Sequence, residues 1–227
     1  MKKMIQKASV VMFALFTLTS NAQDQGNALD SSGEKKNAIA AYFGLPGYGI
    51  GYARKFTDHA ALRVGGTFFG FGFDRDGIDV SDRKVDFETK FNFNKIDLLF
   101  DYTPFKESSF KLVAGLAYLY NGKFTADIIP AEGAYGLTKD QLGTVKAGAD
   151  WSGIAPYIAT GFGRAVPKNN VGFGFELGGY FIGKPDATYE SQGLTAFVEE
   201  EEKKDFEDMV SKFKFMPSLM FHFTVKL

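Results

Sequence analysis

The sequence of 227 residues has no cysteine, only two histidines and no long apolar run. The absence of cysteine excludes disulfide bonds and thiol chemistry. Without a run of about 18 apolar residues, a transmembrane helix is excluded. The motifs G-x-S-x-G, H-E-x-x-H and G-x-G-x-x-G are absent, so no catalytic, cofactor-binding or metal site is predicted. A net charge of −1 carries no basic excess for binding nucleic acid.

The start of the chain has the pattern of a secretory signal peptide. Lys2, Lys3 and Lys7 precede an apolar stretch over residues 8–18, and Ser20-Asn21-Ala22 offers a small-x-small cleavage site. We expect residues 1–22 to be removed and residues 23–36, which are polar and small, to form a flexible lead-in. One folded domain is then expected over residues 37–227.

Aromatic residues and glycine are abundant instead: 25 Phe, 10 Tyr and 26 Gly. Apolar residues alternate with polar ones, most clearly in the last 15 residues, FKFMPSLMFHFTVKL. A period of two indicates strands, because successive side chains point to opposite faces. We predict eight strands, with ranges 37–45, 48–56, 60–73, 85–102, 109–127, 146–166, 171–184 and 213–227.

The connections between these strands are alternately short and long. The predicted long ones follow the third, fifth and seventh strands. The loop after the third strand contains Asp74, Asp76, Asp79 and Asp82, which we interpret as a solvated loop rather than a calcium site. A helix is predicted over residues 195–211, before the last strand. The apolar parity changes near Asn94-Lys95, which predicts a β-bulge there.

The alternation leaves open whether the apolar face meets lipid or a protein core. Bulky Phe and Leu dominate that face, and an eight-stranded barrel is too narrow to hold them inside. Several strands are also long enough to cross a bilayer. The sequence therefore predicts an all-β fold, an eight-stranded antiparallel up-and-down transmembrane β-barrel with one short helix before the last strand. Candidates for aromatic interfacial girdles are Tyr42, Tyr48, Tyr52, Tyr102, Tyr118, Tyr120 and Trp151.

A set of charged residues falls on the parity that faces the barrel interior. Buried charges are costly unless they pair, so we expect opposite charges to meet in the lumen. The predicted network consists of Arg63, Asp97, Asp101, Lys111, Glu176, His222 and Lys226. It would serve either as a plug of salt bridges or as the lining of a narrow polar conduit.

Three stretches of the chain resemble a known family. They are LLFDYTPFKESSFKLVAGLAYLYNGKF, the pair IAPYIATGFGRAV and VGFGFELGGYFIGKPDATYE, and the closing MPSLMFHFTVKL. They resemble small eight-stranded outer-membrane barrels of Gram-negative bacteria, the CarO-like and OmpW- and OmpA-type barrels. The resemblance covers most of residues 38–227, although Leu227 stands where that family usually ends on an aromatic residue. It implies location in the cell outer membrane, contact with outer-membrane lipid, and insertion by the barrel-assembly machinery through the C-terminal strand.

The resemblance also implies a function. CarO-like proteins are linked to carbapenem susceptibility and proposed as uptake channels for ornithine and other small basic solutes. We therefore predict a non-enzymatic, porin-like channel or uptake protein for small polar solutes, without a cofactor. Two alternatives remain: a plugged structural barrel whose outer loops mediate surface interactions, and a soluble periplasmic lipocalin-like ligand carrier.

Overall fold

The computed structural model describes residues 35–80, 83–130, 144–191 and 200–227. The predicted signal peptide, most of the predicted lead-in, Asp82 and the start of the predicted helix lie outside these ranges. The helix α3 (Glu200–Val210) precedes the last strand, where a helix was predicted. Within the described ranges, no helix is both long enough and apolar enough to cross a membrane.

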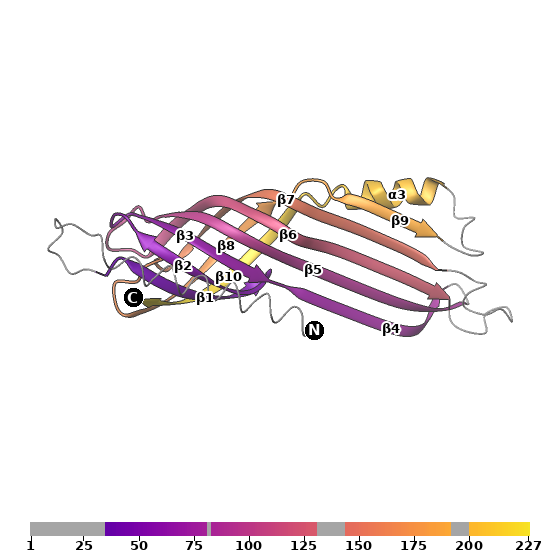
Figure 1. Cartoon of the computed structure of the whole chain (residues 1–227), viewed down its shortest axis with the longest axis horizontal. Helices are drawn as coiled ribbons and strands as arrows, with labels where there is room; N and C mark the ends of the chain where they lie inside the picture. Colours follow the sequence, from indigo (N-terminus) through magenta and orange to yellow (C-terminus); the bar gives the residue numbers. More distant parts are fainter. Residues whose placement is uncertain (1–34, 81–82, 131–143, 192–199) are drawn as a thin grey trace, which may run out of the picture. The chain divides into compact units, whose positions relative to one another are not determined.

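Strands dominate the described chain (Figure 1). There are ten of them, and they agree in position with most of the predicted ranges. They are β1 (Asn37–Leu45), β2 (Gly47–Lys55), β3 (Ala60–Phe68), β4 (Gly70–Val80), β5 (Arg83–Tyr102), β6 (Phe110–Pro130), β7 (Val145–Phe162), β8 (Val171–Phe181), β9 (Asp186–Ser191) and β10 (Phe215–Lys226).

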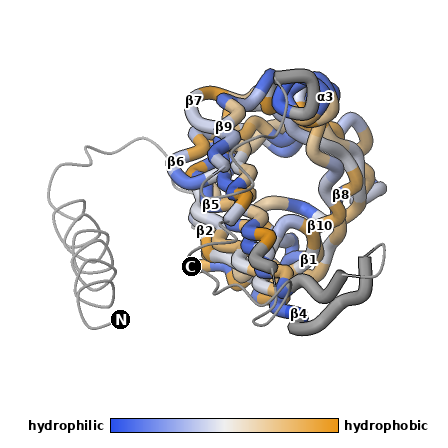
Figure 2. Tube along the Cα trace, turned by 90° about the vertical axis from the view of Figure 1, so that its right-hand side faces the viewer, coloured by the Kyte–Doolittle hydropathy of each residue, from blue (hydrophilic) through white to orange (hydrophobic). Residues whose placement is uncertain are grey.

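The ten strands form one antiparallel sheet that closes on itself. The order is β3-β2-β1-β10-β8-β7-β6-β5, and β3 pairs with β5 to complete the ring. The first and last strands meet along the register Ala38↔Lys226 to Leu45↔Leu219. Eight strands therefore surround the interior. Figure 2 shows this ring from one end. The prediction of an all-β up-and-down barrel is confirmed.

Three strands extend far beyond the closed ring. β5, β6 and β7 have 20, 21 and 18 residues, whereas β1, β2 and β3 have 9 each. Their far halves are joined by β4, which pairs with β5, and by β9, which pairs with β7. The five strands β4-β5-β6-β7-β9 form a sheet extension, on the right in Figure 1.

The sheet extension corrects the predicted loop after the third strand. Asp74, Asp76 and Asp79 lie in β4, paired with β5 in a hairpin that has a register shift between Arg75 and Ile78. The sequence predicted a loop here because Asp and Gly are depleted in strands. Phe71 and Phe73, near the start of β4, fall in the predicted strand 60–73, which the structure divides into β3 and the first residues of β4.

The predicted irregularity at Asn94-Lys95 is confirmed as a register shift between β5 and β6, although its cause differs from the predicted one. The extra residue is Tyr120, on β6, whereas β5 keeps its alternation: Phe93 and Lys95 are both buried. The apolar parity of β5 changes because the surroundings change. Where β5 is part of the closed ring, its apolar side chains face outward, and where β5 is part of the sheet extension, they face inward.

The outer wall of the ring is apolar and exposed. Phe43 and Leu98 are about half exposed, 57% and 51%, and their neighbours around the wall are similar. Register partners place Phe43, Phe221, Phe175, Phe162 and Phe110 in one row across five strands. This wall is expected of a barrel in lipid and does not fit the soluble lipocalin-like alternative.

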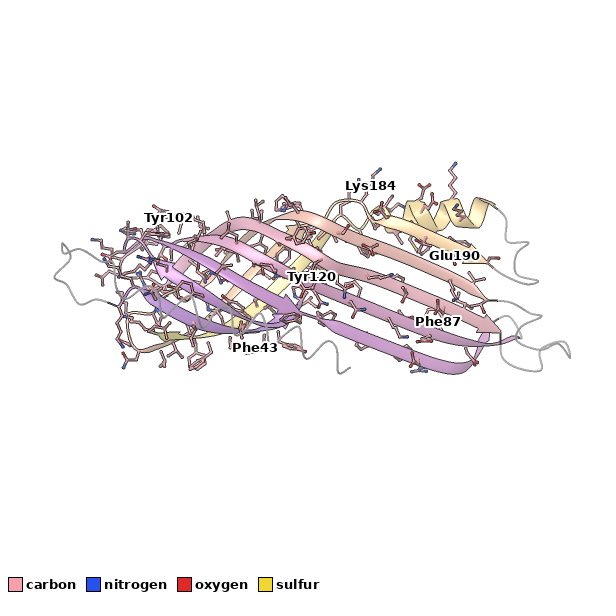
Figure 3. All side chains as sticks on the ribbon, in the orientation of Figure 1. Phe43, Phe87, Tyr102, Tyr120, Lys184 and Glu190 are labelled. Carbon is pink, nitrogen blue, oxygen red and sulfur yellow. The ribbon has the colours of Figure 1, made fainter. Side chains whose placement is uncertain are left out.

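The predicted girdle residues divide between the two faces. Tyr48, Tyr102, Tyr118 and Tyr120 are exposed on the outer wall; Figure 3 labels Tyr102 and Tyr120. Trp151 is buried, with its indole N–H donating to the Phe213 carbonyl at 3.1 Å, so its predicted girdle role is wrong. Tyr42 also faces inward, because it lies on the same parity of β1 as the buried Ala38 and Ala40.

Candidate functional site

Four charged side chains meet in the barrel interior. The Arg63 guanidinium lies 2.7 Å from Asp101 Oδ1 through Nε and 2.7 Å from Glu176 Oε1 through Nη2. Lys111 Nζ donates to Glu176 Oε1 at 2.5 Å and to Asp101 Oδ2 at 3.2 Å. Each cation therefore contacts both carboxylates, and the two positive and two negative charges balance. We call these four residues the central network.

Each member of the central network comes from a different strand. Arg63 is on β3, Asp101 on β5, Lys111 on β6 and Glu176 on β8. All four occupy the inward parity, so the alternation that places Phe and Leu outward also brings these charges together. All four are almost fully buried.

His222 on β10 completes this level of the interior. Its Nε2 is 3.3 Å from Lys111 Nζ and 3.4 Å from Glu176 Oε1. Gly174, on the neighbouring strand β8, leaves room for the ring, because a Cβ there would lie 2.9 Å from His222 Nε2. The Tyr42 ring packs edge-on against it, with centroids 6.5 Å apart. Tyr42 is a lumen residue that the sequence reasoning missed, because Tyr also suits a girdle.

Asp97 does not join the central network, but has a partner of its own. Its Oδ2 accepts a hydrogen bond from Lys95 Nζ, which also donates to Thr67 Oγ1 at 3.1 Å. The Lys95 ammonium lies over the Tyr180 ring, 4.4 Å from its centroid. Lys95 is a second lumen residue that was missed. Its inward parity, shared with Asp97 and Asp101, was the signal that could have revealed it.

Lys226 lies apart from these groups, and its predicted place in the network is wrong. It is half-buried at the end of β10, and its Nζ donates to the Lys168 carbonyl at 2.6 Å. The inward parity of Lys226 suggested a lumen position, but this residue lies too close to the end of the barrel. Arg63, Asp101, Lys111, Glu176 and His222 are thus brought together, Asp97 forms a separate pair, and Lys226 does not take part.

Apolar side chains fill the interior on both sides of the charges. Toward the short turns lies a buried cluster made of Ala38, Ala53, Ala61, Ala165 and Val166, the last two from the β7–β8 turn. Toward the sheet extension, Tyr157 stacks on Tyr180 with ring centroids 4.3 Å apart, and Phe93 packs against Tyr180. Val210 of α3 belongs to the same cluster as Phe93.

Side chains therefore fill the interior at three levels: an aliphatic cluster, the paired charges and an aromatic cluster. Eight strands enclose a space just wide enough for side chains. Three cations, Arg63, Lys95 and Lys111, face the three carboxylates of Asp97, Asp101 and Glu176. Such pairs offset the cost of removing charges from water only while both partners remain. Among the described residues, no group of three or more His, Cys, Asp or Glu side chains could hold a metal ion.

A closed antiparallel barrel with an apolar wall, a charged interior and short turns at one end defines the class: an integral outer-membrane β-barrel protein. The structure resembles solved structures of that class. CarO2 of Acinetobacter baumannii superposes with a TM-score of 0.61 at 18% identity, covering 85% of this chain and 99% of that one. CarO of the same organism gives 0.60 at 20% identity, covering 87% of this chain and 100% of that one.

Neither a protein-family model nor a curated protein matches the sequence. The fold is nevertheless that of the CarO-like outer-membrane barrels, as the sequence motifs indicated. This fold with an apolar wall is typical of proteins of the cell outer membrane.

Proposed function

We propose that the protein is a non-enzymatic outer-membrane barrel with a closed lumen, which acts through the sheet extension beyond the closed ring. The filled interior carries this proposal. The paired charges are buried, and they lie between a buried aliphatic cluster and a buried aromatic cluster. This corresponds to the plugged alternative rather than to an open channel.

The sheet extension offers a surface for interaction. Register partners place Phe71, Phe91 and Phe124 in one row on its inner face. Phe71 lies on the unpaired side of the extension, at the edge strand β4, and is 59% exposed. Phe73 follows on the same face, 41% exposed, with the Arg75 guanidinium 5.2 Å from its ring centroid. Exposed aromatic side chains of this kind are enriched where proteins bind partners.

A porin-like uptake protein for small polar solutes is the second candidate. The observation that favours it is the pairing of both charge signs in the lumen, because such groups can hold ions or polar solutes in a narrow pore. This function requires Lys111 and Arg63 to separate from Asp101 and Glu176, since their present contacts close the lumen.

Planar-bilayer conductance of the purified, folded protein separates the two functions. We expect no discrete single-channel steps from the wild-type protein. A matched variant, Lys111→Met/Glu176→Gln, removes one charge of each sign and leaves Arg63 paired with Asp101, and we expect it to be silent too. Folding is checked by the shift in gel migration on boiling. Discrete steps from the wild-type protein would refute the closed lumen and support uptake.

A further inference from the structure

Four basic side chains gather at the end of the barrel where the short turns lie. Lys106 is in the β5–β6 turn, Arg164 and Lys168 are in the β7–β8 turn, and Lys226 ends β10. We call these four residues the rim cluster. In outer-membrane barrels the short turns face the periplasm, so the rim cluster lies at the inner boundary of the membrane.

Backbone carbonyls hold the rim cluster together. The Arg164 guanidinium donates to the carbonyls of Asp58, Phe105, Lys106 and Ser108, at 3.0, 3.3, 2.8 and 3.1 Å. Lys168 Nζ donates to the Lys106 carbonyl at 2.9 Å, and Lys226 Nζ to the Lys168 carbonyl at 2.6 Å. Because Arg164 and Lys168 share one carbonyl oxygen, their charged nitrogens lie within about 6 Å of each other.

The described short turns hold fewer acids than the four cations of the rim cluster. Among the described residues, the ion pairs of the barrel involve none of the four rim cations. The acids in the short turns are Asp58, which pairs with Lys55 at 3.4 Å, and Glu107, which follows Lys106 and has no ion pair with a rim cation among the described residues. The hydrogen bond from Lys55 holds the pKa of Asp58 below its usual value, and Lys106 adds a weaker effect in the same direction. Like charges held this close repel unless an anion lies among them.

Exposed apolar residues place the rim cluster at the depth of the lipid headgroups. Phe105 immediately precedes Lys106 and is 59% exposed, and Phe56, in the β2–β3 turn, is 58% exposed. Val171 follows the β7–β8 turn on the outer wall and is half exposed. Apolar side chains next to cations are typical of segments whose apolar parts enter the acyl region while the charges stay among the headgroups.

We propose that the rim cluster binds the phosphate groups of anionic phospholipids in the periplasmic leaflet. A phosphate brings several acceptor oxygens to cations whose remaining N–H groups are free to donate. Free phosphate offers the same chemistry, but the neighbouring Phe105 favours a phosphate that carries acyl chains. This site does not depend on whether the lumen conducts.

Native mass spectrometry of the folded full-length protein can test this site. The protein is exchanged into nanodiscs with equal phosphatidylglycerol and phosphatidylethanolamine, released, and scored for the lipid that it retains. We expect the wild-type protein to retain phosphatidylglycerol preferentially. In Lys106→Gln/Lys168→Gln we expect that preference to fall about 25-fold, because each cation near an anionic surface contributes a factor of about five. Lys106→Arg/Lys168→Arg should keep it.

The matched control is Lys90→Gln/Lys123→Gln, which makes the same charge change at two exposed lysines of the sheet extension. The control should retain the wild-type preference, and all variants should show the shift in gel migration on boiling that marks a folded barrel. An unchanged preference in the rim variant, or an equal loss in the control, would overturn the proposal. So would competition by millimolar inorganic phosphate without any lipid preference. Rim-dependent co-sedimentation with peptidoglycan and an unchanged lipid preference would assign the cluster to that polymer instead.

Discussion

Replacing Lys111 with methionine tests whether the central network stabilises the closed barrel. Methionine keeps most of the side-chain volume and removes the ammonium, which is fully buried and contacts both Asp101 and Glu176. The variant then holds two carboxylates against Arg63 alone. Removing one partner of a buried ion pair costs about 3–5 kcal/mol, because the remaining charge has no counterion.

A double-mutant cycle can separate the electrostatic contribution of Lys111 to stability from the effect of changed side-chain packing. In Lys111→Met/Glu176→Gln the remaining charges of the central network, Arg63 and Asp101, balance again. We therefore expect the double variant to lose less stability than the two single variants together, with a coupling energy of about 1–3 kcal/mol. A cost of 3–5 kcal/mol corresponds to a urea midpoint lowered by about 1.5–2.5 M, if the slope is about 2 kcal/mol/M.

The single tryptophan supplies the assay. Trp151 is buried in the interior cluster, so its fluorescence should report unfolding of the barrel in lipid vesicles without a label. Gel migration before and after boiling checks the same transition independently. A Lys111→Met midpoint within about 0.3 M of wild type, or strictly additive single variants, would refute the idea that these charges depend on one another.

Two further predictions concern the wall and the interior. Ile158→Lys, in the lipid-facing wall, should lower the free energy of unfolding by about 2–4 kcal/mol. Ser152→Lys lies six residues earlier on the same face of β7, near the edge of the bilayer, and should lower it by less than about 1 kcal/mol. Equal urea midpoints would place both positions in the same environment. Gly51→Val should cost about 1–3 kcal/mol, because its Cβ would lie 2.7 and 2.9 Å from the Tyr42 ring carbons Cε2 and Cζ. Adding Tyr42→Ala should recover part of that loss, and no recovery would show that the collision lies elsewhere.

The alternation of side chains predicted the closed part of the barrel well, because one physical rule applies there. Lipid selects apolar side chains for the outer face, and the narrow interior selects small or paired polar ones. The range predicted for the first strand, 37–45, agrees with the structure, and the last strand, predicted over 213–227, is two residues shorter at its start and one residue shorter at its end. In β7 the structure places Ile154 and Ile158 outward and Tyr157 inward.

The sheet extension could not be predicted in the same way. Its strands leave the lipid, so both faces tolerate polar residues and the alternation weakens. β4 contains three aspartates and three glycines, a composition that normally indicates a loop. β9 is only six residues long and follows a Gly-Lys-Pro sequence that indicates a turn. Pairing with β5 and β7 stabilises these segments, and pairing between distant residues does not show in the local sequence.

The candidate site shows the same limit at the scale of single residues. Inward parity and charge were sufficient to select Arg63, Asp101, Lys111 and Glu176, although Asp101 and Lys111 lie next to the ends of β5 and β6. Parity does not give height along the barrel. Lys226 was therefore grouped with charges that lie much deeper, although its ammonium contacts a turn carbonyl at the end of the barrel.

The inversion of β5 explains why one strand can carry two opposite patterns without a flip of its side chains. Phe93 and Leu99 both face the interior. The sequence neighbours of Leu99, which are Leu98 and Phe100, lie on the outer wall and are apolar. The sequence neighbours of Phe93, which are Asn92 and Asn94, also point outward but are polar. In a membrane barrel, the parity of the apolar residues therefore depends on whether lipid or water surrounds the strand, as well as on which face each side chain occupies. The position where the apolar parity changes, between Asn94 and Ile96, accordingly marks where the wall leaves the bilayer and the sheet extension begins.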